Sequence, residues 1–134
     1  MKILGIDTSC DDTSAAIVIE KDRALSNVIN SQIKLHHPYG GVVPELASRE
    51  HIRNIIPVVD EALSIASCRL DEIDGVAVTI GPGLIGSLLV GLYYAKSIAY
   101  VNEIPLAAVN HLEGHIHSIF LEDNALSGSE LIRH

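Results

Sequence analysis

Cysteine and basic residues are both scarce in this chain of 134 residues, and each shortage excludes a class of protein. Cys10 and Cys68 are the only cysteines, too few for a disulfide framework or for a zinc knuckle built from this chain alone. The 9 lysines and arginines stand against 17 aspartates and glutamates, which gives a net charge of −8. A free-standing nucleic-acid binder needs a basic surface for phosphate contacts, so such a surface would have to come from a partner.

Long apolar runs and targeting signals are also missing. No run reaches the roughly 18 apolar residues that a membrane helix needs, and the first residues resemble a strand rather than a signal peptide. Charged residues make up only 19% and hydrophobic residues 48%, a balance that excludes a disordered chain. We therefore expect one soluble domain in the reducing cytoplasm, with no membrane attachment.

The hydrophobic pattern of the first third predicts three consecutive strands. They are expected over residues 2–7, 14–20 and 24–31, and the third is more polar and so lies nearer an edge. Residues 36–44 contain two prolines and a Gly-Gly pair, which predicts a loop.

The remainder alternates helices and strands, which indicates an α/β domain with a mixed sheet. Apolar residues at helical spacing predict a helix over residues 45–67, with a kink or two abutting helices at Pro57. The following elements are expected to be a buried strand, an apolar helix, a second buried strand and a last helix, over residues 74–80, 84–100, 105–109 and 110–121.

The strongest local pattern is a pair of histidines four residues apart, His111 and His115. With Asn110 as N-cap, both would lie on one face of a helix, at a spacing suited to one metal ion. Two surface histidines would give the same pattern. Glu113 fits a capping box with Asn110 rather than the H-E-x-x-H arrangement of a zinc protease, and a further metal ligand must come from elsewhere.

Residues 81–86 match the dinucleotide pattern G-x-G-x-x-G between a strand and a helix. We reject a Rossmann site, because no acidic residue ends the next strand to bind a ribose. Two interpretations stay open for Gly81 and Gly83. The helix N-terminus could accept an anion, or the glycines could allow the helix to pack closely on the sheet.

The turn after the first strand gathers three carboxylates and three hydroxyls within residues 7–13. Such a turn can offer backbone amides to a phosphate and carboxylates to a cation. A solvated turn would have a similar composition. We favour function because Asp7 ends a buried strand.

The apolar helix over residues 84–100 carries several small residues and little charge. Small residues allow a second helix to approach closely, so a partner is expected to pack there. A central core helix of this domain alone is the alternative.

Together these motifs resemble the tRNA N6-adenosine threonylcarbamoyltransferase family, formerly described as O-sialoglycoprotein endopeptidases. The resemblance extends over residues 1–124 and is carried, in the family's order, by residues 4–13, 39–49, 81–91 and 109–115. It implies an actin/hexokinase-like (ribonuclease H-like) fold. It also implies transfer of a threonylcarbamoyl group from its adenylate to N6 of the adenosine on the 3′ side of the tRNA anticodon.

The resemblance assigns roles to particular residues. His111 and His115 would bind one iron or zinc ion per subunit, and this ion would help to hold the threonylcarbamoyl donor. The donor, threonylcarbamoyl-adenylate, or another adenine nucleotide would be bound by the acidic and glycine-rich loops, through Asp7, Thr8, Ser9, Asp11, Gly81 and Gly83. No catalytic residue is identified.

The family has a second lobe, which supplies an aspartate metal ligand and most nucleotide contacts, and nothing in this chain matches it. Residues 1–124 are therefore expected to be the N-terminal lobe, inactive alone, and residues 125–134 a linker, a tail or a cloning remnant. The implied partners are a shorter non-catalytic paralogue, an ATPase, and tRNA bound through the full complex. The helices near residues 45–67 and 84–100 are the expected pairing surface, which could also form a homodimer.

Three rival functions remain. The non-catalytic scaffold paralogue would share the opening strands, but we do not expect it to carry the histidine pair. A metalloprotease would need Glu113 as its base, and a sugar or acetate kinase of the same fold would have no use for His111 and His115.

Overall fold

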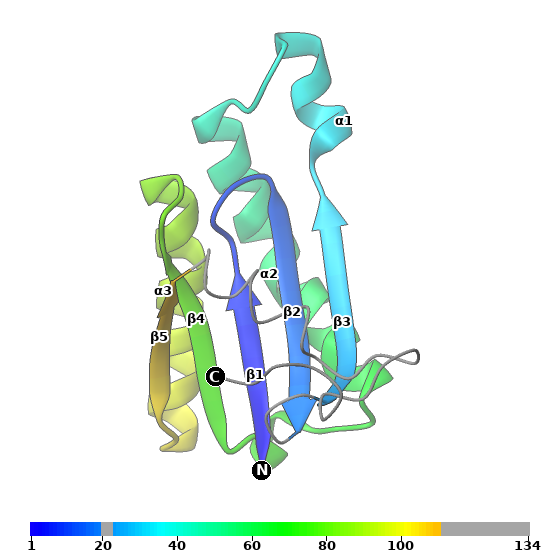
Figure 1. Cartoon of the computed structure of the whole chain (residues 1–134), viewed down its shortest axis with the longest axis vertical. Helices are drawn as coiled ribbons and strands as arrows, with labels where there is room; N and C mark the ends of the chain where they lie inside the picture. Colours follow the sequence, from blue (N-terminus) through cyan, green and yellow to red (C-terminus); the bar gives the residue numbers. More distant parts are fainter. Residues whose placement is uncertain (20–22, 111–134) are drawn as a thin grey trace, which may run out of the picture.

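The computed structural model describes residues 1–19 and 23–110. These residues form a five-stranded mixed sheet in the order β3-β2-β1-β4-β5 (Figure 1). β1 (Lys2–Asp7), β2 (Asp12–Ile19) and β3 (Arg23–Ser31) are antiparallel neighbours, whereas β4 (Gly75–Gly81) and β5 (Leu106–Asn110) continue the sheet parallel to β1. The predicted α/β class and mixed sheet are confirmed.

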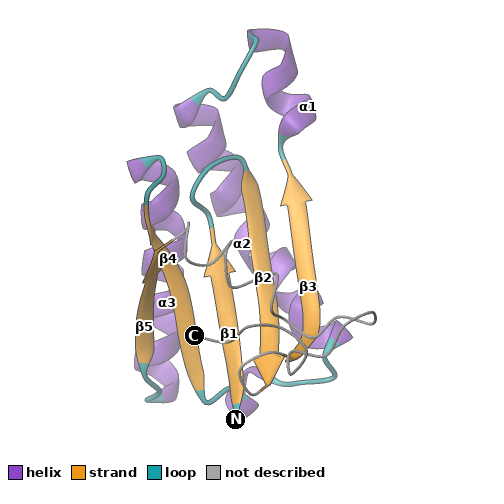
Figure 2. Cartoon of the chain, in the orientation of Figure 1, coloured by secondary structure: helices purple, strands orange, loops and turns teal. Residues whose placement is uncertain are grey.

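Two long helices cover one face of this sheet, as Figure 2 shows. α2 (Pro44–Ile65) contacts β2 and β3, and α3 (Ile85–Asn102) contacts mainly β4. The short segments α1 (Ile33–His36), η1 (His37–Tyr39) and η2 (Leu70–Glu72) connect the larger elements. Among the described residues, no helix combines the length and apolar character needed to cross a membrane.

The core lies between the sheet and these two helices. Because side chains alternate along a strand, β1 buries Leu4 and Ile6 toward the helices and turns Gly5 and Asp7 to the other face. The helices contribute the buried aliphatic residues that meet them, which are Ile55, Val58, Val59, Ala62, Leu63, Ala95, Ile98 and Ala99. Each large aliphatic side chain buried in this way stabilises the fold by roughly 1.5–3 kcal/mol.

One connection and one helix differ from the predictions. Residues 36–44 are not a single loop, since His36 ends α1, residues 37–39 form η1, and Pro44 is the first residue of α2, a position where proline costs no hydrogen bond. α2 is also one helix rather than two, because Pro57 lies on its exposed side and removes only one backbone donor.

The predicted burial of β5 is wrong. β5 was expected to be buried, but it lies at the sheet edge and its side chains are half-buried or exposed. Ile52 and Ile56 share the apolar spacing of α2 yet are 64% and 55% exposed, because Ala47, His51 and Ile55 supply the inner face instead. The helix predicted over residues 110–121 lies outside the described residues, except for Asn110, which ends β5.

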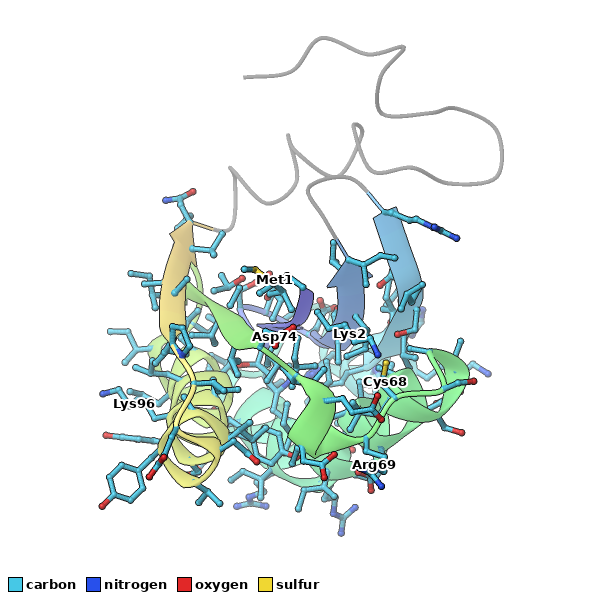
Figure 3. All side chains as sticks on the ribbon, turned by 90° about the horizontal axis from the view of Figure 1, so that it is seen from below. Met1, Lys2, Cys68, Arg69, Asp74 and Lys96 are labelled. Atoms are coloured by element: carbon cyan, nitrogen blue, oxygen red, sulfur yellow. The ribbon has the colours of Figure 1, made fainter. Side chains whose placement is uncertain are left out.

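The lower end of the sheet is closed by a polar cluster, seen in Figure 3 around Lys2, Asp74, Cys68 and Arg69. The Lys2 backbone N–H donates to Asp74 Oδ2 over 2.7 Å, and Lys2 Nζ lies 3.3 Å from Glu72 Oε2. Hydrogen bonds from the Arg69 backbone N–H and from Lys2 hold the pKa of Glu72 below its usual range. These groups are largely solvated, so the ion pair adds little stability.

Candidate functional site

The two loops predicted to bind a ligand meet at one edge of the sheet. Because β1 and β4 are parallel neighbours, their carboxyl ends lie side by side, and the loops that follow both strands leave the upper edge in Figure 1. The Leu84 N–H donates to the Ser9 carbonyl over 2.8 Å. Gly83 lies so close to Ser9 that a Cβ at position 83 would overlap the Ser9 carbonyl oxygen. The glycine turn and the β1–β2 loop (residues 8–11) therefore form one structure.

Asp7 is held in a fixed orientation at the end of β1. Its Oδ1 accepts a hydrogen bond from the Ser9 backbone N–H and its Oδ2 accepts one from Thr79 Oγ1, each at 2.8 Å. Thr79 belongs to β4, so the carboxylate connects the two strands at their shared end. A carboxylate fixed by two donors is preorganised to accept hydrogen bonds from a ligand.

Thr8 secures the loop to α3. Its side chain is 0% exposed, and Oγ1 donates to the Ser87 carbonyl over 2.6 Å while it accepts from the Gly91 N–H over 3.0 Å. The hydroxyl of Ser87 is also buried and has no hydrogen-bond partner among the described residues. At the α3 end of the site, the Thr8 hydroxyl thus both donates and accepts a hydrogen bond, whereas the Ser87 hydroxyl makes none with the described residues.

Asp11 and Cys10 complete the loop. The Asp11 side chain is half-buried, and its carbonyl accepts the Gln32 N–H over 2.9 Å. Cys10 is exposed. Partial desolvation, followed by the negative charge of Asp11, raises the pKa of the Cys10 thiol. This thiol therefore stays protonated at neutral pH and is a weak nucleophile.

A buried network joins the loop to the segment that precedes α2. Gln32 Nε2 donates to the Ala47 carbonyl over 3.3 Å, and Gln32 Oε1 lies 2.8 Å from His36 Nε2. The Val43 N–H donates to His36 Nδ1 over 3.1 Å, so Nδ1 is the acceptor and the neutral ring carries its proton on Nε2. The start of α2 is thereby held against the site.

Sequence reasoning missed His51, which reaches the loop from α2. Its side chain is 0% exposed, and it contacts Cys10 and Thr13. The available signal was its spacing, since it lies four residues from both Ala47 and Ile55 on the inner face of the helix.

The face of the sheet that α2 and α3 leave uncovered contains a hollow of about 250 Å³. Asp7 and Thr79 line it together with Gly5, Ser14, Asn27 and other residues of all five strands. The oriented Asp7 carboxylate therefore borders open volume.

The predicted metal ligands, His111 and His115, lie outside the described residues, as does Glu113. Within residues 1–19 and 23–110, no group of three or more histidine, cysteine, aspartate or glutamate side chains could hold a metal ion. The metal site remains a prediction about the two histidines.

Comparison with known proteins gives the same family by its sequence model and by individual relatives. Residues 23–129 match the family described as TsaD, tRNA N6-adenosine threonylcarbamoyltransferase. The chain is 59% identical over 124 residues to the tRNA N6-adenosine threonylcarbamoyltransferase of Desulforapulum autotrophicum, and 62% identical over 122 residues to that of Thermodesulfovibrio yellowstonii. These matches cover 92% and 91% of this chain but only 37% and 36% of those proteins. The chain thus spans little more than a third of the length of these relatives.

Among solved structures, the chain is similar to YeaZ from Pseudomonas aeruginosa, with a TM-score of 0.63 and 26% identity. That likeness covers 81% of this chain and 43% of the YeaZ chain.

Proposed function

Because the chain belongs to the tRNA N6-adenosine threonylcarbamoyltransferase family, we propose that it supplies the N-terminal lobe of such an enzyme. The enzyme would move a threonylcarbamoyl group from its adenylate to N6 of the adenosine on the 3′ side of the tRNA anticodon. The observation that carries this proposal is the meeting of the β1–β2 loop with the glycine turn, through the 2.8 Å bond from the Leu84 N–H to the Ser9 carbonyl. Residues 1–124 form the lobe in this proposal, and residues 125–134 follow it as a linker or tail.

The adenylate would bind where these two loops meet. The backbone N–H groups of the first turn of α3, which have no acceptor within the helix, attract the phosphate. Gly81 has open space around it and leaves room for the phosphate to approach, whereas Gly83 allows the glycine turn to pack against Ser9. The carboxylates of Asp7 and Asp11 repel a phosphate, so they are assigned to hydroxyl and N–H groups of the donor or to a cation. Thr8 and Ser9 hold the loop in place through their bonds to α3 and to Leu84.

The metal is assigned to His111 and His115, with further ligands from the second lobe. A bound iron or zinc ion would supply Lewis-acid polarisation of the donor.

The reaction itself is an acyl transfer. The N6 lone pair attacks the carbamoyl carbon, the bond from that carbon to the phosphate oxygen breaks, AMP leaves with the electron pair, and N6 loses a proton. Negative charge grows on the carbamoyl oxygen and on the leaving phosphate. Fixed donors such as the N–H groups at the start of α3 would stabilise the charge on the phosphate without reorganising.

The partner surface is assigned to the outer faces of α2 and α3. Ile52 and Ile56 on α2 are 64% and 55% exposed, and Ile85 and Tyr93 on α3 are 77% and 60% exposed. Exposed apolar side chains gathered on two neighbouring helices are typical of an interaction surface. A non-catalytic paralogue of the same fold is the proposed occupant, and a second copy of this chain is the alternative. The ATPase and tRNA would join through the full complex.

A chimera tests the proposal. The matching 124 residues of the Desulforapulum autotrophicum relative are replaced by those of this chain, and the chimera, with its partner proteins, is given tRNA and threonylcarbamoyl-adenylate. Transfer to tRNA is expected, and His111→Ala should reduce it by about 100-fold or more. Glu72→Gln, at the opposite end of the sheet, is the matched control and should leave transfer unchanged.

The chain without a second lobe should bind metal weakly and transfer nothing. Two results would contradict the proposal: robust transfer by this chain alone, or full activity of the His111→Ala chimera.

A further inference from the structure

His51 occupies a position that no role described so far explains. It lies in the second turn of α2, fully buried, directly beneath the β1–β2 loop. Its Nε2 is 2.7 Å from the Cys10 carbonyl oxygen, and its Nδ1 is 2.8 Å from Thr13 Oγ1. One imidazole thus connects the middle of the loop to the start of β2.

The two partners determine the state of the ring. A carbonyl oxygen only accepts hydrogen bonds, so Nε2 must carry the proton that is donated to Cys10. In the neutral ring Nδ1 then has a lone pair, which accepts the Thr13 hydroxyl proton. Burial lowers the pKa of His51, opposed by the Cys10 carbonyl and by the charges of Asp7, Asp11 and Asp12. The neutral Nε2–H tautomer satisfies every polar atom in the contact.

Each residue of the loop is anchored to a different part of the fold. Thr8 bonds to α3, the Ser9 carbonyl to the Leu84 N–H, and the Asp11 carbonyl to the Gln32 N–H. The Cys10 carbonyl is held by His51. Of these loop anchors, it is the one supplied by a side chain of α2, and the same imidazole also contacts Thr13 of β2.

We propose that His51 is a positioning residue for the adenylate site, whose imidazole holds the β1–β2 loop in the geometry that a ligand meets. The identity of the ligand rests on the function proposed above, whereas the positioning of the loop does not. Since an asparagine amide overlays the Nδ1 end of an imidazole and a glutamine amide reaches the Nε2 end, the two contacts can be removed separately. His51→Asn keeps the group near Thr13 and loses Cys10, and His51→Gln does the reverse.

The first readout is the reactivity of Cys10 toward iodoacetamide in the folded chain. Cys68 is 9% exposed and lies at the opposite end of the sheet, so its modification reports global unfolding. His51→Asn should change the alkylation rate of Cys10 by about fivefold. Loss of one hydrogen bond is expected to shift the balance between the held and the released loop by that factor. In His51→Gln, the alkylation rate of Cys10 should stay within about twofold of the wild-type rate, because the hydrogen bond to the Cys10 carbonyl is kept.

Ile55→Ala is the matched control, since Ile55 is buried one turn further along α2, in the aliphatic core. It should destabilise the chain without changing Cys10. An unchanged Cys10 rate in His51→Asn, or an equal change in Ile55→Ala, would overturn the proposal.

The second readout is binding of AMP, measured by calorimetric titration of the two-lobed chimera described above in its unsubstituted, His51→Asn, His51→Gln and Ile55→Ala forms. His51→Asn should weaken AMP binding about fivefold, while His51→Gln and Ile55→Ala keep the wild-type affinity. If the unsubstituted chimera shows no AMP binding, the adenylate assignment fails and the alkylation rates of Cys10 alone decide whether His51 positions the loop.

A third measurement needs no substitution and so remains decisive if a variant fails to fold. The ring nitrogens of His51 in 15N-labelled wild-type protein should show a protonated Nε2 and an unprotonated Nδ1 at pH 7. A neutral ring with its proton on Nδ1 would have no hydrogen on Nε2 to donate to the Cys10 carbonyl and would refute the proposal.

Discussion

Replacing Gly91 by alanine tests how closely α3 supports the β1–β2 loop. An added Cβ would lie 2.6 Å from Thr8 Oγ1, 3.3 Å from Thr8 Cγ2 and 3.5 Å from Ile6 Cγ2. The Thr8 hydroxyl cannot turn away freely, because its side chain is fully buried and bonds to Ser87 and Gly91. The methyl group must therefore displace the loop or break these bonds.

The expected cost follows from three effects. Alanine is favoured over glycine in a helix by about 1 kcal/mol, which alone would stabilise the variant. Overpacking of a buried site costs about 1–3 kcal/mol, and loss of one buried hydrogen bond costs about 1 kcal/mol. The packing effects outweigh the propensity, so the free energy of unfolding should fall by about 2 kcal/mol.

Urea unfolding, followed by circular dichroism, measures this change. Gly86→Ala is the matched control in the same helix, because its Cβ would meet Ser48 Oγ at 2.7 Å and Ser48 Cβ at 3.8 Å. The half-buried Ser48 hydroxyl donates to the Pro44 carbonyl over 3.1 Å in a solvent-exposed bond, which water can replace when the hydroxyl turns away. That variant should be as stable as the wild type or slightly more stable. Adding Thr8→Ala to Gly91→Ala should cost less than the two separate losses together, because the clash is gone. Equal stability of Gly91→Ala and Gly86→Ala would refute the described packing.

Ser87→Ala should leave the melting temperature unchanged or raise it, because its buried hydroxyl has no partner among the described residues. Asp11→Asn should speed alkylation of Cys10 at pH 8, since removing the negative charge lowers the thiol pKa. The folded ring of His51 resists the proton that the unfolded chain binds below pH 6.5. Wild-type stability in urea should therefore fall more between pH 7 and pH 5 than that of His51→Gln. Ile52→Asp should weaken association of the chain with the paralogue, or with a second copy of itself, in sedimentation measurements. It should change the free energy of unfolding of the monomer by no more than about 0.5 kcal/mol.

Much of the sheet was predictable because its strands carry plain local signals. β1 and β4 are short apolar runs that end at an aspartate and at a glycine turn, and β2 is rich in β-branched residues. The exposure of β5 was not predictable from its apolar composition, because its place at the sheet edge depends on the order of the strands. Of the two alternatives predicted at Pro57, two abutting helices are wrong, since a proline on the exposed side of a long helix does not have to end it.

The site was predictable in parts but not as a whole. The loop around Asp7 and the turn at Gly83 each have a recognisable local composition, whereas their contact requires β1 and β4 to be neighbours. His51 was missed because α2 is apolar on two sides. Ile52 and Ile56 match the helical spacing as well as the buried residues do, so the pattern alone does not distinguish the inner face.

Adjacent residues of α2 serve opposite sides of the molecule, since His51 is fully buried under the loop and Ile52 is largely exposed. One extra residue between Pro44 and His51 would rotate the following helix by about 100°, carrying the imidazole away from Cys10. Gly40 and Gly41 lie just before the helix, exposed and with open space around them. Insertions and deletions among natural relatives should therefore collect at this glycine pair and be absent from the first two turns of α2.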